Sequence, residues 1–137
     1  GYIMYDKKTV SVGSLKKGDT VIIDDAPCKV TDVSTSKPGK HGHAKVNLTA
    51  VGLLDGKKRN IVMPGHDKMD APIIEKKSAQ ILSISGTKAN VMDTETYDTF
   101  EMDIPEDLVG EVTEGKEILY WMVMGMKVMK QVKTNNG

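Results

Sequence analysis

Residues 44–63 read AKVNLTAVGLLDGKKRNIVM, and this stretch decides the fold class. From Ala44 to Ala50 every second residue is apolar and the residues between are polar, which is typical of a strand with one buried face. Asp55-Gly56 then separates this run from a second β-rich run at 57–63, a pattern that predicts a β-hairpin. Helical periodicity is absent, so the stretch indicates an all-β fold.

Further strands are expected on both sides of a break near residue 73. Before the break, β-rich runs at 20–24 and 28–33 are separated by the turn signal Asp25-Ala26-Pro27. Pro72 removes a backbone donor, so a short extended connection is expected at 69–75. We therefore divide the chain into a first domain, 1–73, which should be a small barrel, and a second domain, 74–137.

The second domain should contain three strands, a short helix and two more strands, an order typical of a five-stranded oligonucleotide-type barrel, or OB-fold. The helix is expected to start at Pro105, which two acids follow. The four methionines of the last two strands are interpreted as core and strand-edge positions rather than an exposed binding patch. The expected elements are strands at 79–85, 88–93 and 97–102, a helical turn or two at 108–112, strands at 117–124 and 126–133, and a disordered tail at 134–137.

The composition excludes several classes of protein. With 39% hydrophobic and 28% charged residues the chain is typical of soluble globular proteins, and no apolar run approaches the roughly 18 residues of a membrane-spanning helix. The first residues do not resemble a secretory signal and the single Cys28 cannot form an internal disulfide, so we expect a cytoplasmic protein with no membrane partner.

The charge is divided unequally between the two domains although the net charge is zero. Residues 1–73 hold twelve Lys and Arg against eight Asp and Glu, which gives +4. Residues 74–137 hold seven against eleven, which gives −4. The basic first domain is therefore the candidate for contact with phosphate.

A ten-residue loop at 34–43, STSKPGKHGH, is longer than a tight hairpin needs. It has no large apolar side chain to anchor it, so it should project into solvent. Pro38-Gly39 favours a turn directly before Lys40, and Gly42 permits a further change of direction, which places Lys40 at the apex. No acid lies between 34 and 50, and the loop forms a positive patch of Lys37, Lys40, His41, His43 and Lys45.

Several interpretations of these residues remain open. The residues alone support a nucleic-acid-contacting tip and a merely solvated tip equally. His41 and His43 raise a metal hypothesis, but further ligands would have to come from Cys28 or His66, so a metal is less favoured. Cys28 itself is interpreted as a buried structural residue. Five acids of the second domain are interpreted as the solvated face of strands: Asp93, Glu95, Asp98, Glu101 and Asp103.

The loop resembles the modification loop of the translation initiation factor 5A family over residues 36–45, SKPGKHGHAK. The resemblance continues along nearly the whole chain, and the short start resembles the archaeal type, which is related to bacterial elongation factor P. It implies an SH3-like barrel over 1–73 that carries the loop, followed by an OB-fold over 74–137 with one short helix. The other matching stretches are GSLKKGD at 13–19, IIDDAPC at 22–28, APIIEK at 71–76 and VMDTETYDTF at 91–100.

The resemblance also implies a role for Lys40. In this family deoxyhypusine synthase transfers an aminobutyl group from spermidine to the matching lysine, giving deoxyhypusine or, after hydroxylation, hypusine, and no separate cofactor is expected. The lengthened side chain would lie against peptidyl-tRNA in the ribosome and promote peptide-bond formation in elongation, including at proline runs, and in termination. Ribosome, peptidyl-tRNA and rRNA are thus the expected partners, without DNA, and the implied RNA-binding residues are Lys37, Pro38, Gly39, Lys40, His41, Gly42, His43 and Lys45.

Two other function classes were compared with this one. A general RNA-binding or RNA-chaperone protein is the alternative, because both small barrel types commonly bind nucleic acid. An enzyme is disfavoured, because the chain contains no Gly-x-Ser-x-Gly, phosphate-binding glycine loop or Cys-x-x-Cys.

Overall fold

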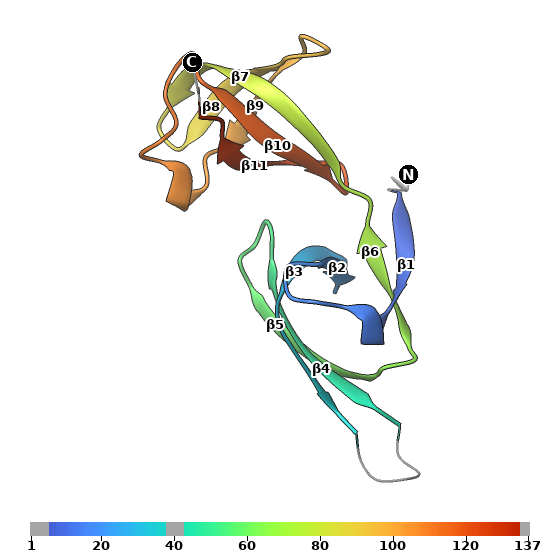
Figure 1. The fold of residues 1–137 in the computed structure, drawn as a ribbon. Helices are drawn as coiled ribbons and strands as arrows, with labels where there is room; N and C mark the ends of the chain where they lie inside the picture. Colours follow the sequence, from blue (N-terminus) through green and yellow to red (C-terminus); the bar gives the residue numbers. More distant parts are fainter. Residues whose placement is uncertain (1–5, 38–42, 135–137) are drawn as a thin grey trace. The chain divides into compact units, whose positions relative to one another are not determined.

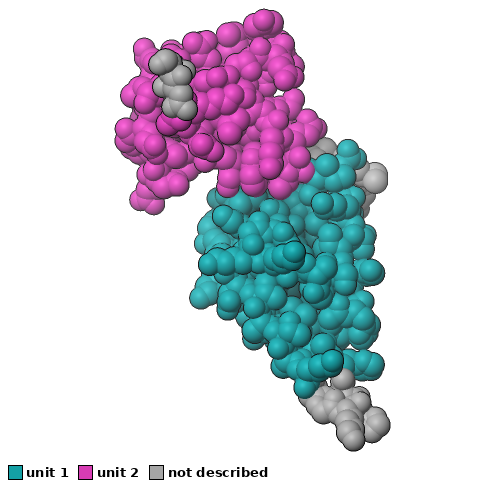
Figure 2. All heavy atoms as spheres, viewed as in Figure 1, with its two compact units in different colours: residues 1–73 teal, residues 74–137 magenta. Residues whose placement is uncertain are grey.

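The computed structural model describes residues 6–37 and 43–134 of the 137-residue chain. The chain forms two compact units, residues 1–73 and 74–137, shown in different colours in Figure 2. The described parts of both units consist of antiparallel strands with one short 3-10 turn each, so the all-β prediction is confirmed. Across the described ranges, no helix has the length and apolar character needed to cross a membrane.

The first unit contains a curled four-stranded sheet of order β2-β3-β4-β5 and a two-stranded sheet that pairs β1 with β6 (Figure 1). Strand β2 also lies against β6, which brings the two sheets around one core. The core side chains include Leu15, Val21, Ile23, Cys28, Val30, Leu48 and Ala50. The elements are β1 (Lys7–Ser11), the 3-10 turn η1 (Val12–Ser14), β2 (Thr20–Ile23), β3 (Ala26–Ser36), β4 (Lys45–Gly52), β5 (Lys58–Pro64) and β6 (Lys68–Pro72).

The alternation that predicted β4 is confirmed. Val46, Leu48 and Ala50 are buried, whereas Lys45 and Asn47 are exposed and Thr49 is half-buried. β4 pairs with β3 on one side and β5 on the other, so its buried face lies in the middle of the sheet. Burial of a side chain as large as Leu48 stabilises the unit by about 2 kcal/mol.

The turn between β2 and β3 lies one residue earlier than expected. Asp24 and Asp25 have φ of 52° and 59°, and they join the paired residues Ile23 and Ala26. Two consecutive residues with positive φ match the right-handed twist of the flanking strands, and aspartate tolerates this conformation well. The predicted break at 25–27 was therefore misplaced, because Ala26 already belongs to β3.

The hairpin predicted between β4 and β5 is present, but its connection is longer than two residues, since β4 ends at Gly52 and β5 begins at Lys58. Both oxygens of Asp55 accept hydrogen bonds from Arg59, with distances of 2.7 Å to Nη2 and 3.2 Å to Nη1. Nη1 also lies 3.6 Å from the Sγ atom of the fully buried Cys28. Burial raises the pKa of the Cys28 thiol, which agrees with the structural role predicted for it.

Strands β1 and β6 were not predicted. The register pairs Lys7 with Pro72 and Ser11 with Lys68, so most of the segment expected to be a plain connection is strand. Pro72 is compatible with this because it is the last residue of β6, at the end of a two-stranded sheet.

The second unit is a five-stranded sheet of order β11-β10-β7-β8-β9 (Figure 1). Strands β11 and β9 approach each other, so the sheet curls towards closure around its core. The core includes Ala79, Ile81, Val91, Met102, Leu108, Ile118, Tyr120 and Met129. The elements are β7 (Glu75–Ser85), β8 (Lys88–Asp93), β9 (Thr99–Asp103), the 3-10 turn η2 (Glu106–Leu108), β10 (Glu117–Val123) and β11 (Met126–Val132).

Three boundaries in this unit differ from the prediction. The expected helix at 108–112 is a single 3-10 turn that ends at Leu108. β7 begins at Glu75, four residues before the expected start, because its first residues pair with β10 as far as Met122. β9 begins at Thr99 rather than at Tyr97, whose φ of 63° excludes it from the strand. The tail at 135–137 lies outside the described residues.

Asp93 was predicted to be solvated and is instead 3% exposed. It follows Ala89 and Val91 on the inner face of β8, so the period of two carries it into the core. One oxygen accepts the N–H groups of Glu95 and Thr96 at 2.8 and 2.9 Å, and the other accepts the Tyr120 hydroxyl. These three bonds replace the water that an exposed carboxylate would bind.

The methionines of the last two strands occupy mixed positions. Met129 is buried in the core, Met122 and Met124 are half-buried, and Met126 is 39% exposed beside the turn at Gly125. Met129 thus occupies a core position, as predicted, whereas Met124 lies in the turn between β10 and β11 and Met126 is exposed at the start of β11.

Candidate functional site

The β3–β4 hairpin carries the predicted loop (Figure 1). Its ladder continues without a register shift from the pair Asp32 and Thr49 to the pair Ser36 and Lys45. Residues 34–36 were predicted to be loop, but they belong to β3 because each pairs with a residue of β4. Lys45 also pairs with Pro64 of β5, so three strands reach the end of the hairpin and stiffen it.

The β5–β6 turn at 64–67 connects the base of the loop to the rest of the unit through hydrogen bonds. The Gly65 N–H donates to the Ala44 carbonyl at 2.9 Å, directly before β4. The Gly65 carbonyl in turn accepts the Gly13 N–H at 2.9 Å and the Ser11 hydroxyl at 3.3 Å. Val12 N–H donates to the Asp67 carbonyl at 2.9 Å. A chain of backbone hydrogen bonds therefore links β1, the β5–β6 turn and the loop base.

Two histidines meet at the same place. The rings of His43 and His66 are 5.4 Å apart, edge to face, and His66 Nε2 lies 3.7 Å from Asp67 Oδ1. Within the described residues, no group of three or more His, Cys, Asp or Glu is arranged to hold a metal ion.

The structure describes only part of the predicted site. Lys37, His43 and Lys45 are exposed, with Lys37 and Lys45 on opposite arms of the hairpin. The other five predicted residues, Pro38, Gly39, Lys40, His41 and Gly42, lie outside the described residues. The described part of the site is thus a three-stranded base with exposed cations on both arms.

Sequence reasoning missed the support that Gly13 and Gly65 give to this base, and it considered His66 only as a possible metal ligand. Pro64-Gly65 is a turn signal, and it could have identified the β5–β6 turn. Nothing local in the sequence indicates that this turn lies against residue 44, because that contact depends on the pairing of β4 with β5.

Replacing Gly13 by alanine is expected to loosen the loop base. A Cβ atom at this position would lie 2.9 Å from the Gly65 carbonyl oxygen, which is backbone and cannot move aside without breaking its hydrogen bonds. The strain should cost about 1–2 kcal/mol of stability. Hydrogen exchange followed by mass spectrometry should show faster exchange in peptides that contain residues 43–46 and 64–67.

Gly110→Ala is the matched control, because a Cβ atom there meets nothing within 4 Å. It should change stability by less than about 0.5 kcal/mol and leave exchange at the loop base unaltered. Unchanged exchange in Gly13→Ala would show that the Gly13 contact does not hold the loop base.

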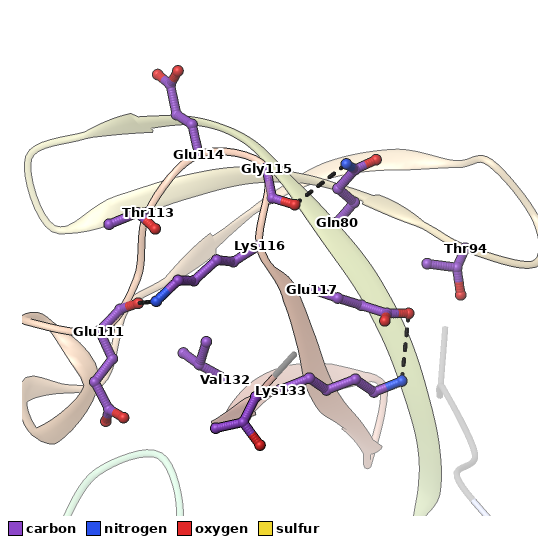
Figure 3. A pocket seen from close by; sticks show the side chains of 11 residues that line it. Gln80, Thr94, Glu111, Thr113, Glu114, Gly115, Lys116, Glu117, Val132 and Lys133 are labelled. Atoms are coloured by element: carbon purple, nitrogen blue, oxygen red, sulfur yellow. Dashed lines mark hydrogen bonds and ion pairs between the residues drawn. The ribbon is translucent and has the colours of Figure 1, made fainter. Parts of the chain in front are cut away.

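A depression of about 990 Å³ in the second unit is a separate candidate (Figure 3). It lies between β7, β10, the connection at 111–116 and the end of β11. Figure 3 shows Lys133 directed at Glu117, with Nζ 3.4 Å from Oε1, and Lys116 Nζ lies 3.4 Å from the Glu111 carbonyl. Because these cations already have partners, the hairpin remains the stronger candidate for the functional site.

Comparison with known proteins decides the family. The family described as translation initiation factor 5A-like, N-terminal, matches residues 6–67. Translation initiation factor 5A of Methanocella arvoryzae is 52% identical over 119 residues, which cover 87% of this chain and 93% of that protein. The chain belongs to the translation initiation factor 5A family. A second member, from Archaeoglobus fulgidus, is 44% identical over 126 residues, covering 92% of this chain and 98% of that protein.

Solved structures of translation initiation factor 5A proteins have the same fold. The protein from Methanococcus jannaschii superposes with a TM-score of 0.88 at 39% identity, covering 97% of this chain and 99% of that one. A family protein from Naegleria fowleri gives a TM-score of 0.71 at 31% identity, covering 93% and 99%. The predicted SH3-like barrel followed by an OB-fold is thereby confirmed, and membership of the family makes the chain a translation factor.

Proposed function

We propose that the chain acts on the ribosome through a hypusine or deoxyhypusine at Lys40, which stabilises peptidyl-tRNA and so promotes peptide-bond formation. The role covers elongation, including proline-rich stalls, and termination. The ribosome supplies the catalysis, so the factor itself is not an enzyme, and its place of action is the cytoplasm.

The observation that carries this proposal is the position of Lys40 in a family-matching loop on a stiff base. The loop starts after Ser36 and ends before Lys45. Ser36 and Lys45 pair with each other in the β3–β4 ladder, and Lys45 also pairs with Pro64 of β5. A base of this kind holds the two ends of the loop in fixed positions. Orientation matters because misplacement of a reacting group by about 1 Å can lower a rate on the order of 100-fold.

The chemistry of the modification suits contact with RNA. An aminobutyl extension keeps the original nitrogen as an amine and adds a second cationic amine at the end of a longer, slender side chain. Together with Lys37 and Lys45 on the two arms, it would present several cations to phosphate and sugar groups. Partners of the site are thus peptidyl-tRNA and rRNA, and deoxyhypusine synthase is the partner during modification.

Mass spectrometry of the protein purified from its native cells tests the modification. The peptide that contains Lys40 is expected to carry one aminobutyl group, with or without an added oxygen, located by fragmentation on Lys40. Peptides that contain Lys37 or Lys45 should be unmodified and serve as internal controls. An unmodified Lys40 in protein from the native cells would contradict the proposal.

A further inference from the structure

The charge of the OB-fold unit is divided between its strands. Nine of its eleven acids lie outside β7, β10 and β11, whereas four of its seven lysines lie within these strands and a fifth directly follows β11. β10 lies between β7 and β11 in the sheet (Figure 1). A unit with a net charge of −4 therefore contains a positive sheet segment, whose lysines are Lys76 and Lys77 of β7, Lys127 and Lys130 of β11, and Lys133 directly after β11.

Trp121, the single tryptophan of the chain, lies in the middle of this segment. It pairs with Lys76 of β7 and with Val128 of β11, on the side of β10 opposite the buried Tyr120. The Lys76 Nζ atom is 5.6 Å from the centre of the Trp121 ring, and the Lys130 Nζ atom is 4.5 Å from it. Two ammonium groups from the two neighbouring strands thus converge on one half-buried aromatic ring.

This arrangement suits a polyanion that also has aromatic rings. Contacts between a lysine and an aromatic ring are weak at solvent-accessible positions, so the ring contact does not prevent either ammonium from also contacting a phosphate. The ring is then open to a base, and tryptophan stacks on bases of any sequence. An acidic protein segment would satisfy the lysines but would leave the ring without a stacking partner.

We infer that this sheet segment, which we call the Trp121 surface and define by Lys76, Trp121 and Lys130, binds single-stranded or looped RNA. Phosphates would contact the two lysines and a base would stack on the ring. The inference does not depend on modification of Lys40, because it concerns a different unit of the chain.

The face by which OB-folds commonly bind oligonucleotides is a poor candidate in this chain. That face is formed by the second and third strands of the fold, here β8 and β9. Glu101 and Asp103 of β9 are exposed acids, and the one lysine of these strands, Lys88, lies 3.0 Å from Asp103 and 3.8 Å from Glu101. These acids would repel phosphate, so the Trp121 surface is the more favourable side of the unit for binding RNA.

Tryptophan fluorescence of the full-length chain tests the inference directly, because its only tryptophan is in the proposed surface. Titration with a ten-nucleotide uridine RNA is expected to quench Trp121 fluorescence in a saturable way. The double variant Lys76→Gln with Lys130→Gln should weaken the Kd obtained from quenching about tenfold at moderate salt. For this double variant, the plot of log K against log salt should be less steep than for the unchanged protein, by a slope of about 1.4. This difference corresponds to two phosphate contacts on a single strand.

The double variant Lys88→Gln with Lys116→Gln is the matched control, since it changes the net charge of the unit equally but lies outside the Trp121 surface. It should bind RNA as the unchanged protein does, and circular dichroism should verify that both double variants are folded. Three outcomes would overturn the inference: no saturable quenching, equal weakening by the two double variants, or stronger quenching by polyglutamate than by RNA. Lys40→Ala should leave the quenching unchanged, so failure here is distinguishable from failure of the hypusine proposal.

Discussion

Replacing Asp93 by alanine is expected to lower the free energy of unfolding of the OB-fold unit by about 3 kcal/mol. The substitution removes the acceptor of three hydrogen bonds, two from the loop N–H groups of Glu95 and Thr96 and one from the buried hydroxyl of Tyr120. Leaving a buried hydroxyl without a partner costs about 1–3 kcal/mol by itself. Urea denaturation followed by Trp121 fluorescence reports the unfolding of this unit, since the tryptophan lies in it.

The carboxyl group of Asp93 should also make the free energy of unfolding depend on pH. The hydrogen bond from Tyr120, followed by that from the Thr96 N–H, lowers the pKa of Asp93 from 3.8 to about 2. Because the folded pKa lies below the unfolded one, the stabilisation is fully present above about pH 4 and is lost as the pH falls to about 2. The unchanged protein should therefore lose about 2 kcal/mol from this group over that range, and Asp93→Ala should not.

Asp107→Ala is the control for Asp93→Ala, because Asp107 is an exposed acid of η2 in the same unit. It should change the free energy of unfolding by less than about 0.5 kcal/mol at any pH in the range. If Asp93→Ala and Asp107→Ala were equally stable, the hydrogen bonds of Asp93 would not hold the β8–β9 loop.

The strands that could be predicted most accurately are those in which apolar and polar residues alternate, because this pattern identifies the buried face within the segment itself. The alternation from Ala44 to Ala50 identified β4 because its buried residues, among them Leu48 and Ala50 of the core, lie on one face of the strand. β1 and β6 carry no such pattern, since together they form a two-stranded sheet whose pairing joins residues more than fifty positions apart. A contact of that range leaves no signal within either segment.

Asp93 and Tyr97 show how a single hydrogen-bonded turn overrides residue preference. Tyrosine favours strands, which is why a strand was expected to start at Tyr97. Asp93 instead bonds the next residues into a tight turn, in which the Tyr97 N–H donates to the Asp93 carbonyl and φ of Tyr97 becomes positive. The burial of Asp93 could have been predicted from Ala89 and Val91 before it, had the alternation been given more weight than its charge.

The hairpin that carries the loop could be located from the sequence, but the contacts that support it could not be predicted. An oversized loop with Pro38-Gly39 and Gly42 indicated a projecting lysine, and the matching family loop strengthened that hypothesis. The length of the β3 ladder and the hydrogen bonds through Gly65 could not be predicted, because they depend on how β4 pairs with β3 and with β5.

Under the proposed function, Lys40→Arg is expected to slow peptide-bond formation on a proline-proline template on the order of 100-fold relative to protein modified at Lys40. Arginine keeps one positive charge at position 40 but cannot accept the aminobutyl group, so the side chain stays short and cannot hold the tRNA end in a productive geometry. The measurement is the rate of dipeptide extension on ribosomes supplied with each factor. Protein made without deoxyhypusine synthase should be as slow as Lys40→Arg, because both lack the extension.

Lys57→Arg provides the control for this variant, since it makes the same chemical change in the same unit, in the β4–β5 connection and away from the loop. It should support the rate of the modified, unchanged protein. Templates without consecutive prolines should respond less to Lys40→Arg, because their peptidyl-tRNA is already well oriented and has less rate to recover. A folded Lys40→Arg protein that restored the full rate at proline-proline would show that charge alone at position 40 is sufficient, and the lengthened side chain would then have no positioning role.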